Sequence, residues 1–305
     1  MQRLIEEQQQ HVCEALERLD GRSFVRDPWQ RAGGGGGLTA VLSDGDVFER
    51  AGVNTSAVWG ELDDLAWAKM VSRPNSGAGA GARDKSGRAF FAAGISMVLH
   101  PRSPLVPTMH ANFRYLTRGD EAWFGGGSDL TPYYPEREDV EHFHRVWKAI
   151  CDRHDAAYYP RFKRWCDEYF YIPHRHETRG VGGIFFDDLG GELEKAFAFV
   201  ADCCRNVLEP YLPIVERRRA EPYGERERRF QLFRRGRYVE FNLVYDRGTA
   251  FGLATGGRVE SILMSLPPLA GWSYAYQPEP GSREAEAMRF FQPQDWLRNV
   301  PRPRE

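Results

Sequence analysis

Histidines are concentrated in one part of this chain. Seven of the eight lie between His100 and His176, and the 129 residues that follow contain none. Histidine exchanges protons near neutral pH and binds divalent metals, so the cluster marks a candidate site for either kind of chemistry. Which of these side chains can act together depends on the elements that carry them.

A strand is predicted over residues 90–100, where apolar residues dominate. Every second side chain of a strand shares a face, so Ser96 and His100 point the same way. The short proline-rich link over 101–109 favours a neighbouring strand directly after it.

That second strand is predicted over residues 110–116. His110, Asn112 and Arg114 then share one face, while the apolar residues between them take the other. Such a polar face ordinarily meets only solvent. A proton-transfer group, an amide and an arginine on one face, beside a serine and a histidine, favour a site instead.

A helix is predicted over residues 137–154. Its apolar stripe includes Phe143 and Trp147, and His144 lies along that stripe whereas His142 lies opposite. If one of these two histidines is functional, the helical phase favours His144.

Composition excludes several classes of protein. A net charge of −2 gives no bulk attraction to nucleic acid, and no apolar run approaches the roughly 20 residues of a membrane helix. The N-terminal residues predict an amphipathic helix rather than a targeting signal. Five cysteines without CxxC spacing indicate reduced, buried thiols and a cytoplasmic protein.

The remaining pattern predicts an α+β fold, with a large antiparallel sheet flanked by helices. A glycine-rich turn over 31–38 follows the N-terminal helix, and the loop over 73–88 is a candidate lid. From about 238 to 273 the apolar period of two predicts a β-meander, with Asp246 in its first turn. Since no composition shift divides the chain, residues 1–305 are predicted to form one domain. No glycine-rich stretch has nucleotide-loop spacing.

Long blocks of this sequence resemble one family, the oxygen-dependent coproporphyrinogen III oxidases. The resemblance runs from about residue 38 to near the C-terminus. Its blocks are GISMVLHPRSPLVPTMHANFR, WFGGGSDLTPYY, RGVGGIFFDDL, YLPIVERR, YGERERRFQLFRRGRYVEFNLVYDRGT and TGGRVESILMSLPPLAGW.

The resemblance implies an oxidoreductase of haem biosynthesis. Such an enzyme converts two propionate groups of coproporphyrinogen III to vinyl groups. It consumes O2 and releases CO2 and H2O2, and the product is protoporphyrinogen IX. The family fold is a large antiparallel sheet flanked by helices, assembled as a homodimer through the stretch from about 238 to 273. No flavin, haem or nicotinamide is implied.

The resemblance also implies roles for individual residues. His110 matches the general acid, and Asp246 matches the residue that faces the pyrrole nitrogens. An Asp in a DRG sequence is also a common turn former, so a purely structural role stays open for it. The matched substrate contacts are Ser96, Asn112, Phe113, Arg114, Gly256, Gly257 and Arg258.

A divalent metal, with manganese a plausible ion, is the one cofactor that the resemblance suggests. The matched ligands are His100, His110, His144 and His174. A metal holds imidazole in its neutral form, which conflicts with His110 as a proton donor. The family includes members that work without metal, so a metal-free reaction of O2 with the pyrrole is the favoured hypothesis.

Two other functions remain open from the sequence. A non-haem metal oxygenase would use two histidines and a carboxylate, for instance His100, His110 and Asp129. A non-catalytic tetrapyrrole-binding protein would bind the porphyrin without consuming oxygen.

Overall fold

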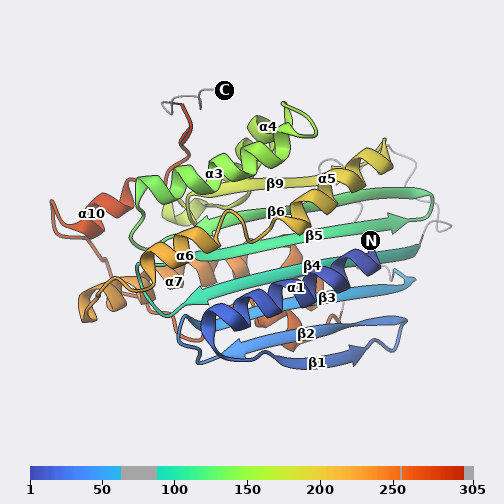
Figure 1. The fold of residues 1–305 in the computed structure, drawn as a ribbon, viewed down its shortest axis with the longest axis horizontal. Helices are drawn as coiled ribbons and strands as arrows, with labels where there is room; N and C mark the ends of the chain where they lie inside the picture. The colour runs from blue at the N-terminus through green and yellow to red at the C-terminus, as the bar shows by residue number, and fades with distance from the viewer. Residues whose placement is uncertain (63–87, 255, 299–305) are drawn as a thin grey trace.

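The computed structural model describes residues 1–62, 88–254 and 256–298, and its centre is a seven-stranded sheet (Figure 1). All neighbouring strands are antiparallel, in the order β1-β2-β3-β4-β5-β6-β9. The α+β prediction is confirmed. The strands are β1 (Val25–Gln30), β2 (Gly35–Ser43), β3 (Phe48–Glu61), β4 (Ala89–Pro101), β5 (Thr108–Arg118), β6 (Glu121–Thr131) and β9 (Gly182–Leu189), with a separate pair β7 (Tyr171–Ile172) and β8 (Glu177–Thr178).

One face of the sheet forms the main hydrophobic core with a layer of helices, which lies in front of the sheet in Figure 1. Phe113 of β5 points into this core, where its ring centroid lies 6.3 Å from that of Trp147. The helices of this layer are α1 (Gln2–Asp20), α3 (Arg137–Asp152), α4 (Tyr158–Tyr169), α5 (Leu193–Arg205) and α6 (Leu212–Arg218).

The C-terminal third of the chain covers part of the opposite face. Tyr238 packs there against Val98 of β4 and Met264, and Ser261 bonds Thr39 of β2 with 2.7 Å between the hydroxyl oxygens. The elements of this part are α7 (Glu225–Val244), α8 (Arg247–Ala254), α9 (Val259–Leu263) and α10 (Arg283–Met288); the 3-10 helix Pro173–Arg175 precedes them in the chain.

The predicted β-meander over 238–273 is wrong, because this stretch begins inside α7 and continues into α8 and α9. The buried face of α7 includes Phe230, Arg234, Tyr238 and Phe241, a helical spacing. Arginine occupies this buried stripe, so the apolar residues alone do not show the helical period. Alternation of apolar and polar residues after 238 then imitates a strand.

Two smaller predictions concern the N-terminal segments. The amphipathic helix is confirmed as α1, which ends at Asp20 and is followed by Gly21 in the left-handed conformation (φ 83°). The glycine-rich turn over 31–38 is shorter than predicted, because Gly35–Gly37 already belong to β2 and pair with β3. Of the candidate lid over 73–88, all but Arg88 lies outside the described residues.

Among the described residues, none of the helices combines the length and apolar composition that a membrane span requires. The assignment of residues 1–305 to one domain stays a prediction.

Candidate active site

The pairing of β4 with β5 creates the polar face that alternation predicts. Ser96 lies opposite Asn112, and Gly94 lies opposite Arg114. Directly paired residues of antiparallel strands point to the same side, so Ser96, Asn112 and Arg114 share one face with His110. The sequence-based grouping of these side chains is therefore confirmed.

Small residues leave space above this face. Arg114 pairs with Gly94 on one side and with Gly125 of β6 on the other. Asn112 likewise pairs with Gly127 of β6. Because glycine has no side chain, the polar groups of β5 stand beside backbone rather than beside bulky neighbours. A broad, flat ligand can approach such a surface.

His110 is held by a hydrogen bond to a buried carboxylate. Its Nδ1 lies 2.9 Å from Oδ1 of Asp129, and its side chain keeps 18% of its exposure while that of Asp129 keeps 2%. Arg179 donates from Nη2 to both Asp129 oxygens at 2.9 Å. Nδ1–H donation to Asp129 fixes the imidazole orientation and leaves Nε2, 3.5 Å from Asn112 Nδ2, for proton exchange.

Asp129 is ionised in this arrangement. Burial alone would raise the pKa of its carboxyl, but the Arg179 charge and the contacts with His110 outweigh burial and lower it. The Asp129 carboxylate therefore accepts the hydrogen bond from His110 and orients the imidazole, as the third residue of many acid–base sites does.

Asp246 begins helix α8 instead of turning a hairpin. Its Oδ2 accepts hydrogen bonds from the Thr249 backbone N–H at 2.7 Å and from the Thr249 hydroxyl at 2.8 Å, which is the geometry of a helix N-cap. Its Oδ1 accepts from the Tyr169 hydroxyl at 2.8 Å. The prediction of a turn former in a β-meander is thus corrected to a helix cap.

The negative charge of Asp246 is stabilised by its surroundings. Burial opposes ionisation, yet the hydrogen bonds from Thr249 and Tyr169, together with the nearby His110, lower the pKa of the Asp246 carboxyl. A carboxylate offers about four acceptor positions, and three protein donors occupy this one. Asp246 can therefore accept one further hydrogen bond from a ligand.

Arg114 and Asp246 approach each other across Gly248. A Cβ on Gly248 would lie 3.3 Å from Asp246 Oδ2 and 3.4 Å from Arg114 Nη1. Arg114 is exposed, and within the described parts of the chain its guanidinium makes no hydrogen bond or ion pair. A ligand that carries a carboxylate and an N–H group would find an unused cation and an available carboxylate side by side.

The other residues predicted to contact the substrate lie farther from the group formed by His110, Arg114 and Asp246, or are buried. Phe113 is fully buried in the core, so its side chain cannot reach a ligand on the polar face. Gly256 is exposed with φ 68°, and the backbone N–H of Gly257 donates to Gly252 O at 2.8 Å. Arg258 pairs with Asp27 of β1 and donates to Ser261 Oγ at 3.3 Å, so it lies over the β1–β2 edge of the face.

The four histidines predicted as metal ligands do not converge. Among the described residues no group of three or more His, Cys, Asp or Glu side chains is arranged to hold a metal ion. His100 is fully buried: its Nδ1 lies 3.2 Å from Thr108 Oγ1, and its Nε2 donates to Ser265 O at 2.9 Å. Burial, together with the Arg235 charge, lowers the pKa of His100 well below its usual value.

His144 is a second core histidine. Its ring nitrogens contact the Tyr159 hydroxyl at 2.9 Å and Val181 O at 3.0 Å, and burial lowers the pKa of His144 to about 3. The helical phase placed it correctly on the buried stripe. Both nitrogens are occupied, so His144 acts in packing and not at the polar face.

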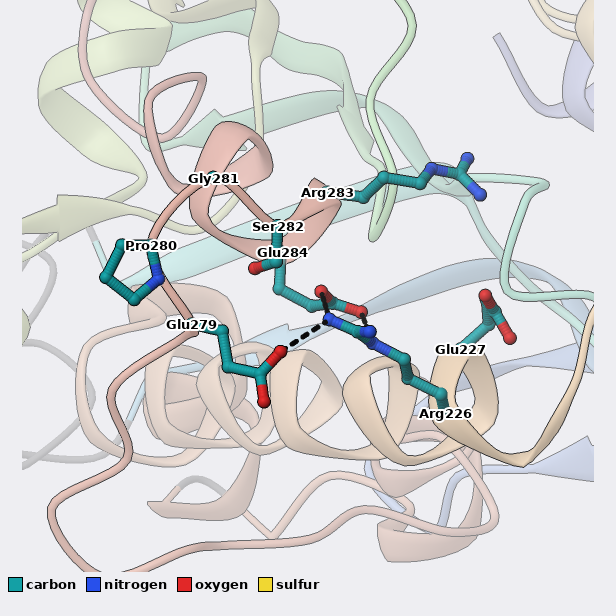
Figure 2. Close-up of a pocket in the computed structure, with 8 residues that line it drawn as sticks. All are labelled: Arg226, Glu227, Glu279, Pro280, Gly281, Ser282, Arg283 and Glu284. Atoms are coloured by element: carbon teal, nitrogen blue, oxygen red, sulfur yellow. Dashed lines mark hydrogen bonds and ion pairs between the residues drawn. The ribbon is translucent and has the colours of Figure 1, made fainter.

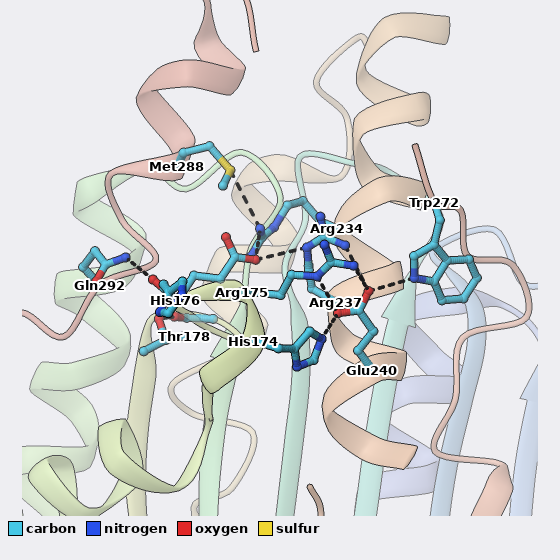
Figure 3. Close-up of polar contacts among 12 residues, drawn as sticks. His174, Arg175, His176, Thr178, Arg234, Arg237, Glu240, Trp272, Met288 and Gln292 are labelled. Carbon is cyan, nitrogen blue, oxygen red and sulfur yellow. Dashed lines mark hydrogen bonds and ion pairs between the residues drawn. The ribbon is translucent and has the colours of Figure 1, made fainter. Parts of the chain in front are cut away.

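His174 belongs to an exposed polar cluster (Figure 3). Its Nδ1 lies 2.6 Å from the Tyr245 hydroxyl and its Nε2 lies 2.8 Å from Glu240. Arg175 and Trp272 donate to the same Glu240 carboxylate. The residues present therefore do not fit one four-histidine metal site, and metal binding stays a prediction.

A chelator experiment tests this directly. We expect dialysis of the purified protein against a chelator to leave most of its activity, because three of the four histidines have both ring nitrogens engaged within the protein. Metal content should be measured before and after dialysis. Complete loss of activity that one specific ion restores would show that a metal is essential.

Two cavities lie away from the polar face. One of about 290 Å³ is lined by charged residues of α7 and of the segment leading into α10, where Arg226 pairs with Glu279 and Glu284 (Figure 2). A second, of about 930 Å³, lies between α1 and strands β1 to β3. Neither includes a predicted site residue. The first has its charges already paired, so it is less suited to an anionic ligand than the face beside Arg114.

Several residues of the site were missed from the sequence. Arg179 bonds both Asp129 and Asn242. Tyr169 bonds Asp246, and the guanidinium of Arg247 lies 4.9 Å from the Tyr169 ring centroid. Asp129 was considered only as a metal ligand. Its place, one strand from His110, could have been found by pairing the two strands that flank the turn at 119–120, because a tight turn fixes the register.

A comparison with protein-family models gives an independent result. The model described as coproporphyrinogen III oxidase matches residues 1–296, nearly the whole chain. The match includes every residue discussed above as part of the site.

Proposed function

Because the chain belongs to the coproporphyrinogen III oxidase family, we propose that its polar face binds coproporphyrinogen III and that His110 and Asp246 act on the bound substrate. The reaction of the family is the oxidative decarboxylation of coproporphyrinogen III in haem biosynthesis, and this chain is an oxidoreductase of that kind. The observation that carries the site proposal is the arrangement of Asp246, Arg114 and His110 around one open face.

The proposed chemistry balances for each propionate group. The group R–CH2–CH2–COO⁻ reacts with O2 and one proton to give R–CH=CH2, CO2 and H2O2. The C–COO⁻ bond and one β C–H bond break, and O2 accepts the two electrons. The proton must come from the protein or solvent, and His110 Nε2 is the group placed to supply it.

Asp246 would act on the pyrrole that reacts. Its remaining acceptor position can take the pyrrole N–H, and its negative charge stabilises a ring that gains positive character as O2 attacks. A preorganised charge of this kind acts without reorganisation during the reaction, and its effect is large in a site from which water is excluded.

Arg114 is proposed to hold a propionate of the substrate. Its guanidinium is exposed and has no partner within the described residues, so it can present two parallel N–H donors to a carboxylate. A charge-assisted contact contributes about 1.5–3 kcal/mol. Ser96 and Asn112, on the same face, would add neutral hydrogen bonds. Arg258 with Gly256 and Gly257 would contact the substrate farther along the sheet, where Arg258 must share its charge with Asp27.

The change Arg114→Lys tests the carboxylate contact. We expect KM to rise about tenfold with a smaller change in kcat, because lysine keeps the charge but loses the planar fork. Steady-state kinetics with coproporphyrinogen III would measure both, and Arg229→Lys, an exposed arginine of α7, is the control. Unchanged KM and kcat in Arg114→Lys would show that Arg114 holds no propionate.

The homodimer is a separate part of the proposal. Among the described residues, seven of the twelve exposed large hydrophobic side chains fall between Leu243 and Tyr274, within or next to the stretch that the family resemblance assigns to dimer formation. Leu243 and Val244 keep 51% and 63% of their exposure at the end of α7. Apolar residues gathered in this way are typical of interaction surfaces.

The change Val244→Asp should weaken this dimer. We expect its dissociation constant to rise on the order of 100-fold, because a symmetric interface loses the apolar residue twice. Sedimentation velocity over a concentration series measures the change. Val25→Asp on β1 is the control, since Val25 is 72% exposed outside this stretch. A dimer that survives Val244→Asp but not Val25→Asp would place the interface at the sheet edge.

A cytoplasmic location completes the proposal. All five cysteines are free and buried, which suits a reducing compartment.

A further inference from the structure

Arg179 is a fully buried arginine between the two proposed functional groups. Only 2% of it is exposed, and its guanidinium carbon lies 4.2 Å from the Phe170 ring centroid, 4.4 Å from that of Tyr238 and 4.9 Å from that of Phe241. Three aromatic rings therefore enclose the guanidinium. A planar cation fits this enclosure better than an ammonium group does.

Two hydrogen-bonding arms extend from this guanidinium. Nη2 donates to both oxygens of Asp129, which in turn accepts from His110. Nη1 donates to Asn242 Oδ1 at 2.5 Å. Asn242 lies in the last turn of α7, four residues before Asp246, so the second arm fixes the helix end from which Asp246 follows.

We propose that Arg179 is a positioning residue that sets the placement of His110 relative to Asp246 by joining the sheet to the end of α7. This inference rests on the proposed roles of those two residues. Arg179 is too deeply buried to touch a substrate, and it acts through Asp129 on one side and Asn242 on the other.

Stability alone does not explain the arrangement. A buried ion pair is often no more stable than well-packed apolar residues of similar size. Arg179 Nε is also buried without a hydrogen-bond partner, which is unfavourable for folding. The arrangement instead provides defined geometry: misplacement of a reacting group by about 1 Å can lower a rate on the order of 100-fold.

The change Arg179→Lys tests the proposal against a matched control. Lysine keeps the positive charge but cannot reach Asp129 and Asn242 together. The control is Arg234→Lys, also a fully buried arginine, which bonds Glu177 at 2.7 Å and lies over the Phe291 ring. Arg234 belongs to the polar cluster drawn in Figure 3 and has no contact with Asp129 or Asn242 among the described residues. Both variants should lose thermal stability to a similar extent. This loss measures what replacing a buried arginine by lysine costs, apart from any role in the reaction.

Only Arg179→Lys should change the reaction. We expect its kcat to fall about 10- to 100-fold with KM within about threefold, because a misplaced acid–base group lowers the rate of the reaction and leaves substrate binding largely unchanged. Arg234→Lys should keep both kcat and KM within about twofold of the wild-type values. Equal kinetics in the two variants would overturn the proposal.

The change Asn242→Leu tests the contact of Arg179 with α7 separately from its contact with Asp129. It also tests the proposal if Arg179→Lys does not fold. It removes the hydrogen bond to α7 and leaves the contacts of Arg179 with Asp129 and of Asp129 with His110 intact, so kcat should fall about tenfold or more while KM changes little. A wild-type kcat in Asn242→Leu would overturn the proposal.

His110→Ala and Asp246→Asn belong in the same series of variants: if both are fully active, the proposed site itself is wrong. If both are inactive while Asn242→Leu and Arg179→Lys behave as wild type, only the role of Arg179 fails.

Discussion

His110→Ala should lower kcat on the order of 10²- to 10⁴-fold while the protein remains folded, the scale expected for a positioned acid–base group. The side chain lies on the open polar face, and Asp129 fixes its Nδ1. Removal of the imidazole leaves Asp129 paired with Arg179, so no unpaired buried charge results and stability should change little. Turnover, thermal midpoint and binding of an unreactive porphyrin analogue should be measured on one preparation.

A second histidine in this chain provides a matched control. His154 contacts Asp202 at 2.9 Å, and Arg153 bonds the same carboxylate, so the group repeats the His–Asp–Arg pattern of the site at the protein surface. His154→Ala should keep wild-type turnover. If His110→Ala also keeps it, His110 has no part in the reaction.

The sequence was most informative where alternation is strict. In β4 and β5 a residue's face follows from its number, so the grouping of Ser96, Asn112 and Arg114 with His110 could be predicted without a structure. The short link between the two strands favoured their being neighbours, and the structure pairs them. These predictions depend only on local strand geometry, and the structure therefore confirms them.

Predictions that depended on tertiary partners were less successful. His100 and His144 are hydrogen-bonded in the interior, and their partners Ser265 and Val181 are far away in the sequence. A histidine with two such partners resembles a metal ligand in its burial and in its place on an inner face. Only the positions of the partners distinguish the two roles.

The failure at α7 has a different cause. Its buried face carries Arg234, Arg235 and Asn242, which a search for apolar periods counts as exposed. Its last turn carries Leu243 and Val244, which are exposed and would be covered in the proposed dimer. The charged residues 221–235 favour a helix, and α7 confirms it. Polar residues inside and apolar residues outside reverse the usual pattern in the later turns, so the continuation of the helix beyond 238 and the cap at Asp246 were missed.

Asp246→Asn should lower kcat on the order of 100-fold or more while structure and substrate affinity change little. Asparagine is as good a helix N-cap as aspartate, so its carbonyl oxygen can still accept the Thr249 N–H. The Tyr169 hydroxyl can accept from the new amide where it now donates to the carboxylate. What the change removes is the negative charge that the low pKa of Asp246 maintains at neutral pH.

A matched control for this exchange is Asp20→Asn. Asp20 is also a carboxylate that accepts backbone N–H groups, at 3.0 Å from Val47 and 2.7 Å from Phe48, and it lies in α1 on the other face of the sheet. It should lose stability and keep its turnover. In Asp246→Asn, a loss of kcat with retained thermal midpoint and analogue affinity means that the charge acts on the reacting pyrrole. Retained turnover would show that Asp246 serves only as the cap of α8. A charge used only in the reaction stabilises the transition state and not the folded state. Turnover lost in proportion to stability would therefore show that this variant acts through folding.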